Sequence, residues 1–109
     1  MEGGERATEY EEKILVGIPL YNSEETIASI VLSSLKYSDE VVCIDDFSTD
    51  LSAEIAKKSG ATVISHNRNR GVGGAAKTLF NYAKEKNASI VILIDSDGQH
   101  DPEDLPKLI

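Results

Sequence analysis

The sequence has one cysteine, no tryptophan and three prolines in 109 residues. A single cysteine excludes an internal disulfide framework and a Cys-x-x-Cys metal site, and it is consistent with a reducing compartment. Basic residues are also scarce, because 11 Lys and Arg stand against 19 Asp and Glu, for a net charge of −8. So acidic a surface repels phosphate groups, which argues against non-specific binding to nucleic acid or anionic membranes. A phosphate-containing ligand would need a cation or backbone N–H groups to offset that repulsion.

Long hydrophobic runs are absent as well. No apolar run approaches the roughly 20 residues that span a bilayer, and no basic region followed by an apolar stretch stands at the N-terminus. We therefore expect a cytoplasmic protein. The apolar share of 40% and the charged share of 28% are typical of a globular chain. We expect one core in residues 13–109, preceded by an acidic, flexible tail over residues 1–12.

From Lys13 onward, short apolar runs alternate with amphipathic segments, which is typical of βαβ units in a parallel sheet. Right-handed crossovers would give a three-layer α/β/α, Rossmann-like fold with a mainly parallel sheet and ligands at the carboxyl ends of its strands. Apolar periodicity and capping residues predict strands over 13–19, 41–44, 61–65 and 89–94, and helices over 24–35, about 50–58 and about 74–86, with another after Pro102.

The sequence predicts further details of these elements. The first strand should end at Pro19, which lacks a backbone donor, and Ser23 should cap the first helix. The continuously apolar fourth strand should be covered on both faces. The third helix should bury one stripe of side chains, consisting of Ala76, Leu79, Phe80 and Ala83.

Carboxylates follow two of the predicted strands. Asp95 and Asp97 come directly after the fourth strand, where a turn can direct both carboxylates to one hard cation that bridges to a diphosphate. The alternative is that the Asp, Ser and Gly residues of this segment form a turn and cap the next helix. Asp46 follows the second strand, where it can accept hydrogen bonds from a base or a ribose. The alternative for Asp46 is helix capping, which we expect of Asp50.

The loop after the first strand offers further ligand contacts. Pro19 fixes the exit of the chain, Tyr21 presents a flat face for a base, and Asn22 can satisfy backbone groups of the loop.

A glycine-rich segment, NRGVGGAA, opens the third helix. It matches the dinucleotide fingerprint G-x-G-x-x-A through Gly71, Gly73 and Ala76. The placement is poor for a dinucleotide site, because His66 to Arg70 separate it from the preceding strand. A helix start at which the backbone approaches phosphates or packs closely fits equally well.

Three other reactive side chains have simpler interpretations. Cys43 is interpreted as a buried strand residue rather than a nucleophile, and His66 as a loop residue without a special role. His100 either assists metal or diphosphate binding or is a solvated or capping histidine.

The segments IPLYNSEETI, VVCIDDFSTD, NRGVGGAAKT and VILIDSDGQHDP, in this order and spacing, resemble family 2 glycosyltransferases with the GT-A fold. The DSDGQHDP form is most similar to the dolichyl- and polyprenyl-phosphate mannose and glucose synthases. The resemblance covers residues 13–109 and implies the nucleotide-sugar-binding, N-terminal part of a GT-A catalytic domain.

The resemblance also implies an activity and a set of site residues. It implies a metal-dependent hexosyltransferase that binds a UDP- or GDP-sugar and transfers the sugar to a polyprenyl or dolichyl phosphate. The nucleotide sugar would contact Pro19, Tyr21, Asp46, Arg70, Asp95 and Ser96. Asp95, Asp97 and Gln99 would bind Mg²⁺ or Mn²⁺, which stabilises the leaving diphosphate.

One departure from the family pattern leaves the base open. Ser23 stands where the family commonly has the first of two acidic residues after Tyr-Asn. The family carries its general base and acceptor-binding segments after the Asp-x-Asp region. We therefore expect those groups beyond Ile109, donor binding without efficient transfer by this chain alone, and a full-length protein at the cytoplasmic membrane face.

Two alternatives belong to other functional classes. An NAD(P)-binding Rossmann domain would bind its dinucleotide without metal and would depend on Gly73. A response-regulator-like module needs an acceptor Asp at the end of its third strand, where this chain has Ser65 and His66.

Overall fold

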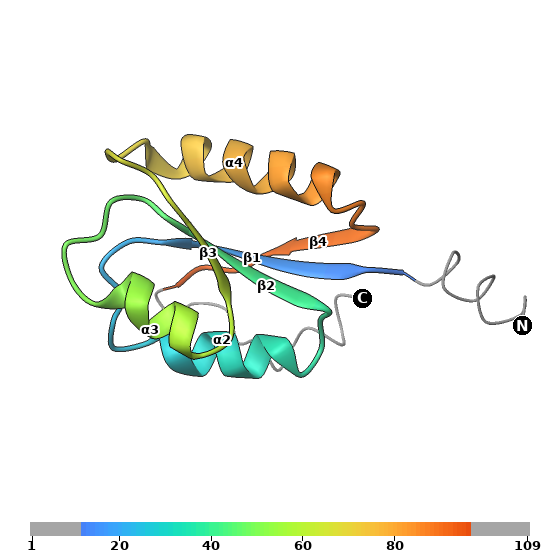
Figure 1. Ribbon diagram of the computed structural model, residues 1–109, viewed down its shortest axis with the longest axis horizontal. Coiled ribbons are helices and arrows are strands. Elements are labelled where there is room, and N and C mark those ends of the chain that lie inside the picture. Colours follow the sequence, from blue (N-terminus) through green and yellow to red (C-terminus); the bar gives the residue numbers. More distant parts are fainter. Residues whose placement is uncertain (1–11, 97–109) are drawn as a thin grey trace, which may run out of the picture.

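A sheet of four parallel strands lies at the centre of the computed structural model, which describes residues 12–96 (Figure 1). In chain order the elements are β1 (Ile14–Leu20), α2 (Ile27–Leu35), β2 (Glu40–Asp45), α3 (Ser52–Lys58), β3 (Thr62–Ser65), α4 (Gly71–Glu85) and β4 (Ile90–Leu93). The strand order is β3-β2-β1-β4. The prediction of a three-layer α/β/α fold with a parallel sheet is confirmed.

Helices cover both faces of the sheet. Helices α2 and α3 lie on one face and α4 on the other (Figure 1). Successive side chains of a strand point to opposite faces, so Val16 and Ile18 of β1 pack in the cluster with α2, whereas Leu15 packs in the cluster with α4. The apolar side chains of β1 and β2 in both clusters are at most 1% exposed, which explains the continuous apolar runs in these strands.

The predicted buried face of α4 is partly wrong. The buried residues are Ala75, Leu79 and Ala83, whereas Phe80 is 55% exposed. The reason is a close approach between α4 and β1. A Cβ atom at Gly17 would lie 2.1 Å from Cδ2 of Leu79, so the helix rests on the strand at this glycine. That contact sets the rotation of the helix about its axis. The apolar pattern alone does not distinguish this rotation from one that would bury Phe80.

Pro19 lies one residue before the end of β1, whereas the sequence predicted that the strand ends at Pro19. Strand β1 pairs with β2 as far as Leu20, but its pairing with β4 ends at Gly17. The Gly17 carbonyl accepts from Ile94 N–H on the β4 side, and the Leu20 carbonyl accepts from Asp46 N–H on the β2 side. Backbone groups alternate sides along a strand, so the missing N–H of Pro19 faces the β4 side and removes no bond to β2. Here β1 and β4 separate.

The helix starts differ from the prediction in two places. Helix α2 begins at Ile27 after a turn in which the Ser23 carbonyl accepts from Thr26 N–H and Ile27 N–H. The Ser23 hydroxyl does not cap this helix, so that expectation is wrong. Helix α4 begins at Gly71, three residues earlier than predicted. Asp50 does cap α3, because its Oδ1 accepts from Ser52 N–H at 2.9 Å.

The described part of β4 is only half covered. Val91 packs in the α4 cluster and Ile92 in the α2 cluster, as expected, but Leu93 is 43% exposed. Full coverage on both faces was therefore wrong for Leu93. The residues of the predicted tail before Glu12 and the helix expected after Pro102 lie outside the described part of the chain. Between residues 12 and 96, no helix is long and apolar enough to cross a bilayer.

Candidate functional site

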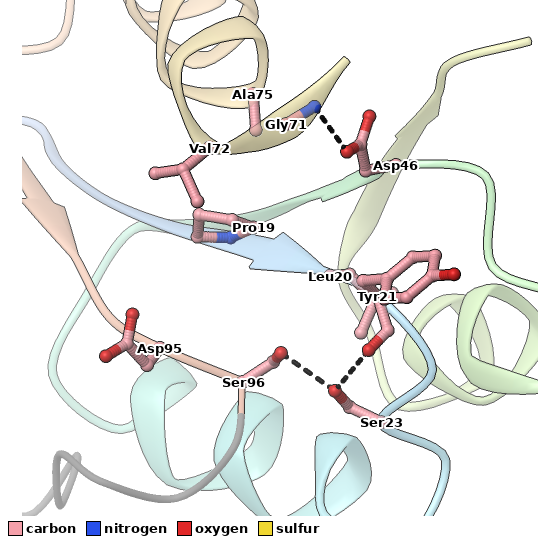
Figure 2. A pocket seen from close by; sticks show the side chains of 10 residues that line it. All are labelled: Pro19, Leu20, Tyr21, Ser23, Asp46, Gly71, Val72, Ala75, Asp95 and Ser96. Carbon is pink, nitrogen blue, oxygen red and sulfur yellow. Dashed lines mark hydrogen bonds between the residues drawn. The ribbon is translucent and has the colours of Figure 1, made fainter. Parts of the chain in front are cut away.

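A cavity of about 290 Å³ opens where β1 and β4 separate. The chain leaves β1 toward β2 and β3 on one side, then returns across the sheet to β4 on the other. Ligands of open parallel sheets bind at this kind of reversal point, beyond the carboxyl ends of the strands. Figure 2 shows the start of α4 on one side of the cavity, the residues after β4 on the other, and the end of β1 between them. Its lining consists of Pro19, Leu20, Tyr21, Ser23, Asp46, Gly71, Val72, Ala75, Asp95 and Ser96.

The predicted binding residues converge on this cavity, with one exception. Those that line it are Pro19, Tyr21, Asp46, Asp95 and Ser96. Arg70 is not part of the lining. Its side chain lies over Gly74, where an added Cβ would meet the Cβ of Arg70 at 2.5 Å.

The predicted metal site can be located only in part. Asp95 lines the cavity, but Asp97 and Gln99 lie outside the described residues. Among residues 12–96, no group of three or more His, Cys, Asp and Glu side chains is arranged to hold a metal ion.

Asp46 joins β2 to the first turn of α4. Its Oδ1 accepts from Arg70 N–H at 2.7 Å, and its Oδ2 accepts from Gly71 N–H at 2.8 Å. Burial raises the pKa of Asp46, but the hydrogen bonds from Arg70, His66 and Gly71 outweigh that effect and hold the pKa below its ordinary value. The ionised carboxylate therefore caps α4, which explains why this helix begins at Gly71.

His66 makes contacts in this region that the sequence did not predict. Its side chain is 4% exposed, with Nδ1 2.9 Å from Asp46 Oδ1 and Nε2 2.8 Å from Thr78 Oγ1. The prediction of a loop residue is confirmed, but the side chain is buried and makes two specific contacts, which that prediction did not include. One sequence signal was available, because His66 directly follows β3 and so lies at the same sheet edge as Asp46.

Two side chains of the β1–α2 loop hold the segment after β4. The Ser23 hydroxyl donates to the Tyr21 carbonyl at 3.1 Å and lies 2.8 Å from the Ser96 hydroxyl, contacts that are drawn in Figure 2. Thr26 Oγ1 donates to the Ser96 carbonyl at 2.5 Å. The residue that departs from the family pattern thus fixes the position of the chain just before Asp97. Thr26 carried no signal in the sequence.

The loops after β1 and β2 are also joined. Asn22 Oδ1 accepts from Thr49 N–H at 2.8 Å, which confirms the expectation that Asn22 satisfies loop backbone groups, and Asn22 N–H donates to Ser48 Oγ at 3.0 Å. Asn22 and Phe47 both have positive φ angles, of 47° and 69°. Because Asn tolerates this conformation far better than Phe, strain concentrates at Phe47, next to Asp46.

Cys43 takes no part in the site. It is fully buried in β2, and burial, with a smaller contribution from Asp45, raises the pKa of its thiol to about 12. A thiol that stays protonated at neutral pH is a poor nucleophile. The interpretation of Cys43 as a buried strand residue is confirmed.

Comparison with known proteins identifies the family. The sequence model described as Glycosyl transferase family 2 matches residues 15–109. The chain belongs to glycosyl transferase family 2. This membership agrees with the resemblance and favours it over the dinucleotide-binding and response-regulator alternatives.

The relatives of this chain are longer proteins. An uncharacterized protein of Methanocaldococcus jannaschii is 40% identical over 100 residues, which cover 90% of this chain and 41% of that protein. The UDP-N-acetylglucosamine–dolichyl-phosphate N-acetylglucosaminyltransferase of Methanococcus voltae is 33% identical over 110 residues, which cover 84% of this chain and 44% of that protein. The chain therefore spans about two fifths of these relatives' length.

A solved glycosyltransferase shares the fold. The crystal structure of glucosyl-3-phosphoglycerate synthase from Mycobacterium tuberculosis, in complex with Mn²⁺, UDP and glucosyl-3-phosphoglycerate, superimposes with a TM-score of 0.72 at 30% identity. The match covers 97% of this chain and 41% of that one. The fold of this family 2 chain thus matches part of the GT-A fold of that glycosyltransferase.

Proposed function

We propose that the protein is a metal-dependent glycosyltransferase that binds a UDP- or GDP-sugar in this cavity and transfers the sugar to a polyprenyl or dolichyl phosphate. One observation carries the proposal. Asp46 after β2, Tyr21 after β1 and Asp95 after β4 line the same cavity. A nucleoside could therefore rest at one end while its diphosphate reaches the segment that begins with Asp95.

The nucleoside end of the cavity offers flat and polar contacts. Pro19 faces Val72 at the start of α4 (Figure 2). Tyr21 is 51% exposed, which leaves its ring available to a base. A carboxylate has about four acceptor positions. The Asp46 carboxylate accepts three bonds within the described chain, so it retains capacity for a ribose hydroxyl or a base N–H. Arg70 would approach the donor from the adjacent loop.

The diphosphate end offers oxygen ligands. Carboxylate and amide oxygens, as in Asp95, Asp97 and Gln99, are the ligands that Mg²⁺ and Mn²⁺ prefer, so the residue types fit. When bound there, the cation supplies charge neutralisation at the leaving diphosphate, which matters in a chain of net charge −8. Ser23 and Thr26 position this end, because both contact Ser96.

The acceptor is assigned by similarity. The Methanococcus voltae relative is named as a transferase that acts on dolichyl phosphate. Both this relative and the Methanocaldococcus jannaschii protein are more than twice as long as the chain. We place the general base and the acceptor contacts in a part of the protein beyond Ile109, and the protein at the cytoplasmic membrane face. The 109 residues alone should bind the donor without efficient transfer.

Titration calorimetry tests the proposal. UDP, GDP and their sugars are titrated into the protein with Mn²⁺ and again with EDTA. We expect one nucleotide to bind with Mn²⁺ and to lose at least about tenfold in affinity, or about 1.4 kcal/mol, on chelation or in Asp97→Ala. Glu54→Ala is the matched control, because it removes an exposed acid of α3 that does not line the cavity. Metal-independent binding of NAD(P) that is lost on Gly73 substitution would instead support the dinucleotide-binding alternative.

A further inference from the structure

We propose that His66 is a positioning residue for the donor site, which acts through Asp46 and Thr78 to hold the first two turns of α4 against the sheet. The inference rests on the proposed function, because the wall that it positions is that of the donor cavity. His66 itself does not line the cavity, so its effect on a ligand must pass through its neighbours.

The backbone of His66 is fixed by the sheet. It directly follows β3, and its N–H donates to the Asp45 carbonyl at 2.8 Å. Asp46 is fixed in the same way, because its N–H donates to the Leu20 carbonyl of β1 at 2.9 Å. The backbones of His66 and Asp46 are therefore both held by the sheet, and their side chains both contact α4 or the residue before it.

The two side chains form a continuous bridge to the helix. His66 Nδ1 lies 2.9 Å from Asp46 Oδ1, which also accepts from Arg70 N–H at 2.7 Å. At the other edge of the ring, Nε2 lies 2.8 Å from Thr78 Oγ1. An ionised carboxylate can only accept hydrogen bonds, so Nδ1 carries a proton and donates it to Asp46. The bond is charge-assisted and buried, which strengthens it.

The spacing of the contacts on α4 explains the positioning role. Asp46 holds the backbone at Arg70 and Gly71, and His66 holds Thr78, two turns or about 10 Å further along the helix axis. The helical residues that line the cavity, Gly71, Val72 and Ala75, lie within this interval. One imidazole therefore connects both attachment points of the segment that forms the wall.

Removal of the imidazole should loosen this wall. Without His66, the Asp46 carboxylate loses one of its three donors and gains space to rotate, so it can hold Arg70 N–H and Gly71 N–H less firmly. Thr78 loses its link to the sheet at the same time.

The test compares three variants of the full-length protein by UDP or GDP titration in Mn²⁺, using whichever nucleotide the wild type binds. His66→Ala removes both bonds and His66→Asn keeps an amide donor near the position of Nδ1. Thr78→Val removes the second bond together with the bond from Thr78 Oγ1 to the Gly74 carbonyl. We expect an affinity loss of about tenfold for His66→Ala and of at most about threefold for His66→Asn. Thr78→Val should lie between these two variants.

Two additional measurements separate positioning from stability. Hydrogen exchange at the Arg70 and Gly71 amides should be faster in His66→Ala than in His66→Asn, and melting temperatures record any general loss of stability. If His66→Ala does not fold, His66→Gln replaces it, because its longer side chain places the amide near Nε2 rather than Nδ1. If His66→Asn loses as much nucleotide affinity as His66→Ala, or as His66→Gln where that variant is used, the bond between His66 and Asp46 does not position the site.

Failure of the inference and failure of the proposed function give different results. If His66→Ala binds the nucleotide with wild-type affinity, the inference is wrong and the proposed donor site is unaffected. If the wild type binds neither UDP nor GDP, the proposed function fails and the inference fails with it.

Discussion

The contact between Gly17 and Leu79 yields a quantitative prediction. A Cβ atom at Gly17 would lie 2.1, 2.5 and 2.8 Å from three side-chain carbons of Leu79. Ordinary carbon contacts are about 3.5–4 Å, so Gly17→Ala requires a retreat of roughly 1.5 Å. Leu79 is fully buried among Leu15, Val42 and Ile44, so turning its side chain aside would push it into these neighbours. The added atom therefore either displaces Leu79 within the core or separates the helix from the strand.

The magnitudes follow from this geometry. Overpacking of this kind lowers the free energy of unfolding by about 1–3 kcal/mol, and the short distances favour the upper end. Leu79→Ala should lower it by about 2–5 kcal/mol, because it leaves a cavity in the core. The double variant should be less destabilised than the sum of the two changes by about 2 kcal/mol, because the atoms that would clash with the new Cβ are then absent.

Urea denaturation of the wild type and the three variants measures these free energies in a double-mutant cycle. Gly17 does not have a positive φ angle, so the backbone itself accepts alanine and the cost reports the clash. Additivity within about 0.5 kcal/mol would refute the close-packing argument. Gly17→Ala should also weaken nucleotide binding, because α4 supplies Gly71, Val72 and Ala75 to the cavity.

Two further predictions concern titratable groups. Cys43 should resist iodoacetamide at pH 8 in the folded protein and react in denaturant, because it is buried with a thiol pKa of about 12; rapid labelling of the native protein would contradict its placement in β2. The folded pKa of Asp46 is lowered from the ordinary 3.8, so its contribution to stability is present above about pH 4 and is lost as pH falls through the folded pKa. Asp46→Asn should therefore lose less stability than the wild type on acidification, measured by denaturation at several pH values; parallel curves would count against the assigned bonds.

The order and type of the elements could be read from the sequence, because strands and helices have different apolar periods. Local capping was readable at α3, although the predicted Ser23 cap of α2 is wrong. Asp50 caps α3 as predicted, and Gly60, with φ of 112°, ends the helix where the sequence analysis placed its end. Each of these features depends on residues a few positions apart.

Features that depend on distant residues were not readable. The rotation of α4 depends on the contact between Leu79 and Gly17. The capping of α4 depends on Asp46, which is separated from the helix in the chain by α3 and β3. The contact between Ser23 and Ser96 could not be predicted from apolar periodicity, because the two residues lie far apart in the chain and belong to different loops.

The sequence by itself determined the layered α/β architecture and the sheet edge at which the polar residues would gather, since alternation and strand order are local and topological properties. Only the tertiary structure decided that the Asp46 carboxylate, the His66 imidazole and Thr78 form one buried connection beneath the cavity wall. Hydrogen bonds depend on tenths of an ångström between side chains of different elements, and those distances exist only once the sheet and α4 have packed together.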